Sequence, residues 1–224
     1  MFKFKGISSD EMQVIIEEEE HFIARAAQRY EVTEIEGKDG AIFDELGYSF
    51  VERPIYVQCL NIDKIDEILS WLNGKGKFEY KGRKTTARFY SSLEPQRNAC
   101  IRIIDTIFIR DPFWYNVEDE YTQVTDNISN DGNIESRPII RLEKTTKNNV
   151  DITINDIRFE YNFNEDDYVE IDCEEKQVLY NGLNRSRQIT IGYDFPKLNV
   201  GNNRILINSG NCIIKVKRKD RWLW

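Results

Sequence analysis

The stretch that decides the fold class is residues 150–161, Val-Asp-Ile-Thr-Ile-Asn-Asp-Ile-Arg-Phe-Glu-Tyr. Apolar and polar residues alternate on both sides of the Asn155-Asp156 pair. Successive side chains of a strand point to opposite faces, so this alternation indicates strands with one buried face. Asn and Asp favour tight turns. The stretch therefore predicts two half-buried strands joined by a short turn.

The same period of two recurs through most of the chain. Pro54 lies inside one such run and has no backbone donor, which indicates a sheet edge or a bulge. We expect residues 94–98 to separate two paired strands, and the last two strands to form a closing hairpin. The other expected strands span residues 30–36, 50–60, 86–93, 99–110, 168–173, 177–180, 204–208 and 212–217.

One segment has the helical period instead. Apolar residues at helical spacing predict a helix of about three turns over Asp63–Asn73, with Asp63 at its start and Gly74 at its left-handed end. The spacing gives the helix one apolar stripe that packs on a sheet. The stripe consists of Ile62, Ile65, Ile68, Leu69 and Leu72.

Residues 121–137 are the expected domain boundary. Asp126–Asn133 is rich in turn-forming residues and poor in apolar ones. We expect an N-terminal β-rich domain with one α-helix over residues 1–119, a linker over 120–135 and a C-terminal domain over 136–224. Short strands without helices in the last part predict a β-sandwich of the jelly-roll type.

Composition excludes several classes of function. The 224 residues include 31 Lys and Arg against 39 Asp and Glu, a net charge of −8 that argues against a duplex-DNA-binding surface. No long apolar run predicts a membrane span, and no signal peptide is evident, so we expect folding in a cytoplasm. The four cysteines are far apart and there is one histidine, which favours free buried thiols over a zinc site.

No catalytic, cofactor or metal site emerges from the residues. His21 follows a run of four glutamates, but no nucleophile or second ligand accompanies it. Gly82–Thr85 lacks the glycine spacing of a phosphate loop, and we expect a hairpin turn there. Asn127–Gly132 resembles the start of a calcium loop, but the twelfth position is Pro138 rather than glutamate.

The C-terminal segment 215–224 mixes basic and aromatic residues, as single-stranded nucleic-acid grooves do. Because the rest of the chain is acidic, we favour a last strand with its terminal tryptophans packed on the sandwich.

Several sequence blocks resemble the siphophage distal tail protein family. Residues 4–10, 30–40, 68–72 and 111–115 are similar to the N-terminal part of that family. In the second half the similar blocks are residues 136–140, 150–155, 169–172 and 194–203. Each block has a structural meaning only, and their order over the whole chain carries the resemblance.

The resemblance implies a non-enzymatic virion protein at the distal tail tip of a phage. Family members form a homo-hexameric ring that joins the tail tube to tail-associated, fibre or receptor-binding proteins, with genomic DNA passing through the lumen. It implies an N-terminal ring-forming belt domain and a C-terminal galectin-like β-sandwich. Gly37, Lys38, Asp39 and Gly40 become candidate turn and ring-interface positions. An acidic lumen that repels DNA is a further expectation from the net charge.

Two alternatives remain. The C-terminal sandwich is a carbohydrate-binding module for host attachment if surface aromatic residues form a sugar platform, with candidates Tyr161, Phe163, Tyr168, Tyr180, Tyr193, Trp222 and Trp224. A tail enzyme that cleaves cell-wall glycans would need a carboxylate pair whose separation the sequence does not give.

Overall fold

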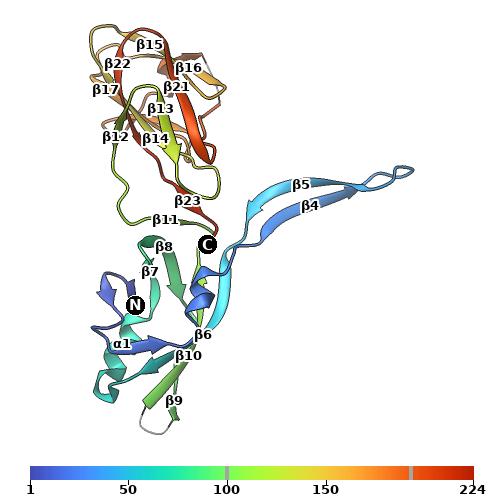
Figure 1. The fold of residues 1–224 in the computed structure, drawn as a ribbon, viewed down its shortest axis with the longest axis vertical. Coiled ribbons are helices and arrows are strands. Elements are labelled where there is room, and N and C mark those ends of the chain that lie inside the picture. The colour runs from blue at the N-terminus through green and yellow to red at the C-terminus, as the bar shows by residue number, and fades with distance from the viewer. Residues whose placement is uncertain (99–100, 192–193) are drawn as a thin grey trace. The chain divides into compact units, whose positions relative to one another are not determined.

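The computed structural model describes residues 1–98, 101–191 and 194–224 and is mainly β, as predicted (Figure 1). It divides into two compact units. The first contains Met1–Val117 with Leu223–Trp224, and the second contains Glu118–Trp222. Cys100 and Tyr193 lie outside the described residues.

The first unit is built on one antiparallel sheet and a separate hairpin. The sheet order is β2-β1-β7-β8-β10-β6-β3, with β9 on β10 and β11 on β8, while β4 pairs only with β5. The elements are β1 (Phe2–Phe4), β2 (Ile7–Ser8), β3 (Val14–Ile16), η1 (Glu19–Ile23), β4 (Gln28–Glu34), β5 (Ala41–Tyr48), β6 (Val51–Cys59), η2 (Ile62–Lys64), α1 (Ile65–Trp71), β7 (Gly74–Tyr80), β8 (Arg83–Phe89), β9 (Glu94–Asn98), β10 (Ile101–Arg110) and β11 (Trp114–Asn116).

Aromatic rings fill the core of this unit. Phe22 lies 4.9 Å from both Phe78 and Phe108, measured between ring centroids, in edge-on arrangements that aromatic pairs prefer. Phe4 and Phe89 extend the cluster at 5.0 Å. All five side chains are almost completely buried, so the alternating apolar positions of β1, β7, β8 and β10 meet in one core.

The helix is shorter than its period predicted. α1 has seven residues and follows the η2 turn, and the cap is Asn61, whose side chain accepts a hydrogen bond from the Asp63 amide at 3.1 Å. Ile68 and Trp71 are buried, and the Trp71 indole donates to the Phe4 carbonyl at 2.8 Å. The buried tryptophan, which the aliphatic stripe did not include, fastens the helix to the sheet.

Two strands of the first unit contain a proline. Residues 94–98, expected as a connection, form β9 and pair with β10, with Pro95 opposite Ile104. A proline is tolerated in β9 because this strand pairs with β10 alone. Pro54 of β6 pairs with Ile107, but β3 covers only Val57–Cys59, so Pro54 faces a local sheet edge as predicted.

The second unit is a sandwich of two antiparallel sheets with the orders β12-β22-β14-β17-β18-β19 and β13-β21-β15-β16-β20. Its elements are β12 (Thr122–Val124), β13 (Asn127–Asn130), β14 (Ile139–Lys144), β15 (Asn149–Ile154), β16 (Ile157–Asn162), β17 (Tyr168–Asp172), β18 (Gln177–Tyr180), β19 (Leu183–Asn184), η3 (Ser186–Gln188), β20 (Ile189–Ile191), β21 (Gly201–Ser209), β22 (Cys212–Lys217) and β23 (Arg221–Trp222).

The opening stretch is confirmed as the hairpin β15–β16, with Ile154 opposite Ile157. Asn155 has a φ of +51°, the left-handed conformation that a tight turn requires and asparagine tolerates. Val150, Ile152 and Tyr161 are fully buried in the sandwich core.

The prediction that the last two long strands, β21 and β22, form a closing hairpin is wrong. β21 pairs with β13 and β15, whereas β22 pairs with β12 and β14, so the chain changes sheets between them. The segment 120–135 also differs from the expected linker, because it contributes β12 to one sheet and β13 to the other. Period identifies a strand, but it does not identify the partner that the strand pairs with.

Candidate functional site

The hairpin β4–β5 is an exposed arm of the first unit, the blue ribbon pair of Figure 1. Every residue of β4 is exposed, and so is every residue of β5 except the half-buried Tyr48. The strands pair with each other along their length. Because a two-stranded hairpin is marginally stable alone in water, such an arm is a surface that assembly would cover.

One face of the arm carries a group of exposed apolar side chains. Val32 lies opposite Phe43 in the register, and Tyr30, two residues earlier, shares that face. The Tyr30 and Phe43 rings contact each other with centroids 5.6 Å apart. The exposed fraction is nevertheless 58% for Tyr30 and 62% for Phe43. Exposed aromatic side chains grouped on one face are typical of protein interfaces.

The four candidate positions Gly37, Lys38, Asp39 and Gly40 form the tip of the arm. The Lys38 amide donates to the Ile35 carbonyl at 3.1 Å, closing a turn. Gly37 and Gly40 have φ values of +79° and +86°, which side chains with a Cβ rarely adopt. Both glycines face open space, so backbone conformation explains them. Contact of the tip with a neighbouring copy stays a prediction.

Arg110, which the sequence analysis missed, anchors the base of the arm. It is fully buried, and its guanidinium donates to the carbonyls of Phe22 and Ala24 at 3.0 and 2.5 Å, shortly before β4 begins. It also donates to the carbonyls of Asp111 and Pro112 at 2.8 and 3.0 Å. Burial lowers the Arg110 pKa to about 10, so the group stays charged at neutral pH.

The sequence did contain a signal for Arg110. It lies two residues after Phe108 in an alternating strand, so the period places it on the buried face. A backbone hydrogen bond joins the two strands at the base of the arm: the Ser49 amide, just after β5, donates to the Ala27 carbonyl, just before β4, at 2.8 Å.

The outer face of β6 and β10 is a second exposed apolar surface. Pro54 and Ile107 are opposite each other, and Tyr56 shares their face. Ile15 of β3 lies opposite Gln58 and extends the surface, with 50% of the residue exposed. Among the described residues, the unit therefore exposes apolar side chains both on the arm and on this face of the sheet.

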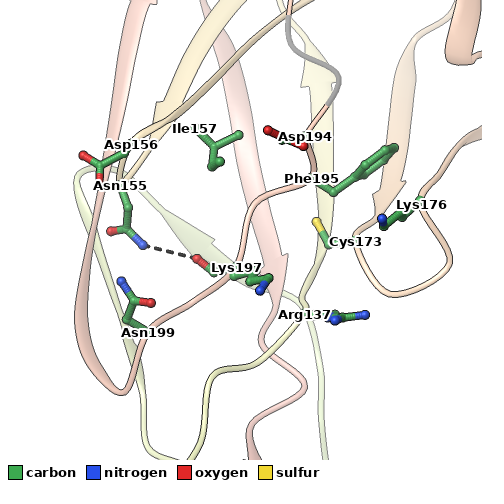
Figure 2. Close-up of a pocket in the computed structure, with 10 residues that line it drawn as sticks. All are labelled: Arg137, Asn155, Asp156, Ile157, Cys173, Lys176, Asp194, Phe195, Lys197 and Asn199. Carbon is green, nitrogen blue, oxygen red and sulfur yellow. Dashed lines mark hydrogen bonds between the residues drawn. The ribbon is translucent and has the colours of Figure 1, made fainter. Parts of the chain in front are cut away.

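A pocket of about 500 Å³ lies within the second unit (Figure 2). Its walls come from the β15–β16 turn, the β17–β18 turn and the segment before β21. Its lining residues are Arg137, Asn155, Asp156, Ile157, Cys173, Lys176, Asp194, Phe195, Lys197 and Asn199. None of these residues was singled out as a site residue from the sequence.

The histidine and the glycine-basic motif have structural roles. His21 Nδ1 lies 2.7 Å from the Pro54 carbonyl oxygen and 3.2 Å from a Glu18 carboxylate oxygen. Gly82 and Lys81, both with positive φ, form the turn between β7 and β8, as the sequence predicted.

The calcium-like segment is held by protein groups. Asp131 accepts from the Ser129 hydroxyl at 2.9 Å and pairs with Arg218 at 2.7 Å, and these bonds lower the Asp131 pKa. Within the described residues, no group of three or more His, Cys, Asp or Glu side chains is arranged to hold a metal ion.

The C-terminal tryptophans differ from each other. Trp222 is buried and belongs to the second unit, whereas Trp224 belongs to the first unit, so the expected packing of both on the sandwich is wrong. The Arg83 guanidinium lies 4.1 Å from the Trp224 ring and donates to the Trp224 carbonyl at 2.8 Å.

Cys59, Cys173 and Cys212 are free and buried.

Among the described residues, no helix has the length and apolar character needed to cross a membrane.

Comparison with known proteins gives a consistent result. Residues 131–222 match the family described as siphovirus-type tail component, C-terminal domain. No curated protein matches the sequence significantly. The crystal structure of the Dit (gp 19.1) protein of phage SPP1, described as a paradigm of the hub adsorption apparatus in phages that infect Gram-positive bacteria, aligns with a TM-score of 0.71. That alignment covers 96% of this chain and 97% of the SPP1 chain at 13% identity.

A chain of the phage p2 baseplate, in its activated conformation with Sr, aligns at 11% identity over 95% of this chain and 93% of the other. Its TM-score of 0.40 supports no further argument. The resemblance to the siphophage distal tail protein family is therefore confirmed for residues 131–222, and nearly the whole chain shares the fold of the SPP1 protein.

Proposed function

We propose that the protein is a structural, non-enzymatic hub of a phage tail tip or baseplate. The observation that carries this proposal is the fold shared with the SPP1 hub protein over both units, together with the family match of residues 131–222. The protein would then be located in the virion, at the distal end of the tail.

We further propose that six copies form a ring through the arm. A ring of identical subunits uses one head-to-tail interface, repeated until rotation closes it. We assign this interface to the arm side chains Tyr30, Val32 and Phe43 and to the sheet face around Pro54 and Ile107, because both expose apolar groups. Gly37–Gly40 at the arm tip belongs to the same interface.

In this arrangement the ring joins the tail tube on one side to tail-associated or receptor-binding proteins on the other. DNA passes through the lumen, and the net charge of −8 disfavours its retention. The N-terminal domain that we expected over residues 1–119 corresponds to the first unit, Met1–Val117 with Leu223–Trp224, and it carries the ring contacts.

Light scattering on the purified full chain tests the ring. Six copies of 26.5 kDa give 159 kDa. The double variant Y30S/F43S removes the apolar arm face and should shift the mass toward the monomer. Leu183→Ser is the matched control, because Leu183 is a comparably exposed apolar residue (59%) on the second unit. Equal masses for wild type and Y30S/F43S would refute the role of the arm.

A further inference from the structure

The pocket of the second unit has the size of a small-molecule site. Its volume of about 500 Å³ lies within the roughly 300–1,000 Å³ of ligand pockets. Figure 2 shows its lining residues on separate connections of the sandwich, among them the β15–β16 turn, the β17–β18 turn and the segment before β21. The hub function proposed above makes no use of them.

One wall of the pocket is fixed by a buried asparagine. Asn203 is fully buried, and its side-chain oxygen accepts from the Asn155 side-chain amide at 2.8 Å and the Asn199 amide at 2.7 Å. Its nitrogen donates to the carbonyls of Asn199 and Gly201 at 2.9 and 2.8 Å. Asn155 also donates to the Lys197 carbonyl at 3.2 Å, the dashed line in Figure 2. This network preforms the wall, so a ligand need not order it.

The interior of the pocket has apolar groups. Phe195 is half-buried and packs against the sandwich core, and Ile157 lies on the opposite connection. Burial raises the pKa of the Cys173 thiol, which is therefore neutral at physiological pH. A half-exposed phenyl ring beside apolar groups is suited to the C–H face of a sugar ring.

The rim carries both hydrogen-bond donors and acceptors. Arg137, Lys176 and Lys197 are cationic, while Asp156 and Asp194 are acceptors. Two of the cations already have carboxylate partners at the edge, because Lys197 lies 3.0 Å from Glu135 and Arg137 lies 3.6 Å from Glu174. The rim is therefore close to electrically balanced, and a strongly charged ligand of either sign would meet like charges.

We propose that this pocket binds a neutral saccharide unit. Hydroxyl groups both donate and accept, so they match a rim that carries both carboxylates and cations, and hydrogen bonds to charged groups are the stronger kind. The site would give the hub a direct contact with a hydroxyl-rich polymer. This inference goes beyond the hub function and does not depend on ring formation.

Saturation-transfer NMR on the full chain tests the proposal. The probes are the methyl glycosides of glucose, galactose, rhamnose and N-acetylglucosamine, with glycerol 3-phosphate as an anionic probe. At least one glycoside should bind saturably, and D156N and F195A should each weaken it about tenfold, as expected for one lost charge-assisted hydrogen bond or stacking contact. The control K147Q changes an exposed lysine outside the pocket and should leave binding unchanged.

Three results would overturn the proposal: no saturable binding of any glycoside, equal binding by D156N and wild type, or binding of glycerol 3-phosphate alone. If F195A does not fold, D156N and K176Q carry the test, since both residues are exposed in turns. Light scattering on the same samples reports ring formation separately, so loss of sugar binding and loss of the ring are distinguishable.

Discussion

Replacing Arg110 with lysine tests whether one buried guanidinium holds the base of the arm. Lysine keeps the charge and much of the stem, but it concentrates three donors on one nitrogen, whereas arginine spreads five over a planar fork. Arg110 uses that fork to reach four carbonyls at 2.5–3.0 Å and a fifth, from Leu223, at 3.4 Å.

The magnitude follows from these contacts. A single ammonium group retains about two of the carbonyl partners, which leaves at least two buried carbonyls without one. Each unpaired buried group costs about 1–3 kcal/mol, so R110K should destabilise the first unit by about 3 kcal/mol. Arg88→Lys is the matched control, because Arg88 pairs with Asp111 at 2.6 Å from a partly exposed position and such pairs contribute about 1 kcal/mol or less.

Urea denaturation with hydrogen-exchange readout is the assay. R110K should lower the free energy of unfolding of the first unit and speed amide exchange over residues 22–27, while R88K leaves both near wild type. A loss below about 1 kcal/mol for R110K, with unchanged exchange at residues 22–27, would refute this account of the anchor.

Three other predictions concern the second unit and the thiols. Gly132→Ala should destabilise the second unit by about 1–3 kcal/mol, because the added Cβ would lie 2.3 Å from the Arg221 carbonyl oxygen; a melting temperature equal to wild type contradicts this. Burial raises the Asp220 pKa from 3.8 to about 6, so the folded protein binds this proton more readily than the unfolded chain, and this contribution to stability falls as pH rises from 3.8 to 6. D220N should therefore be more stable than wild type at pH 7.5, with the advantage shrinking toward pH 4, and a pH-independent difference in urea midpoints would disprove it. Cys59, Cys173 and Cys212 are free and buried, so a thiol reagent should label these three only on unfolding; their rapid labelling in the native protein, identified by peptide mass spectrometry, would be the opposite result.

The sequence predicted strands better than it predicted their partners. Residues 150–161 form the expected hairpin because the alternation and the turn pair act within a few residues. β21 and β22 are separated by a connection as short as the one between β15 and β16, yet they enter different sheets. Gly210 between them lies where a Cβ would be 2.3 Å from the Asn149 carbonyl oxygen, a close tertiary approach that periodicity does not report.

The site was predictable in part for the same reason. The turn at Gly37–Gly40 followed from glycine conformation alone. The exposure of Tyr30 and Phe43 did not follow, because alternation in an arm looks the same as alternation over a core. The pocket of the second unit joins residues from connections far apart in the chain, which only the folded structure brings together.

The central claim is that the chain is a ring-forming hub, and negative-stain imaging of the purified full chain tests it most directly. The account predicts rings with sixfold symmetry in the class averages, which Y30S/F43S abolishes and Leu183→Ser preserves. Wild-type particles without a ring, at concentrations where light scattering already reports a single uniform species, would contradict it.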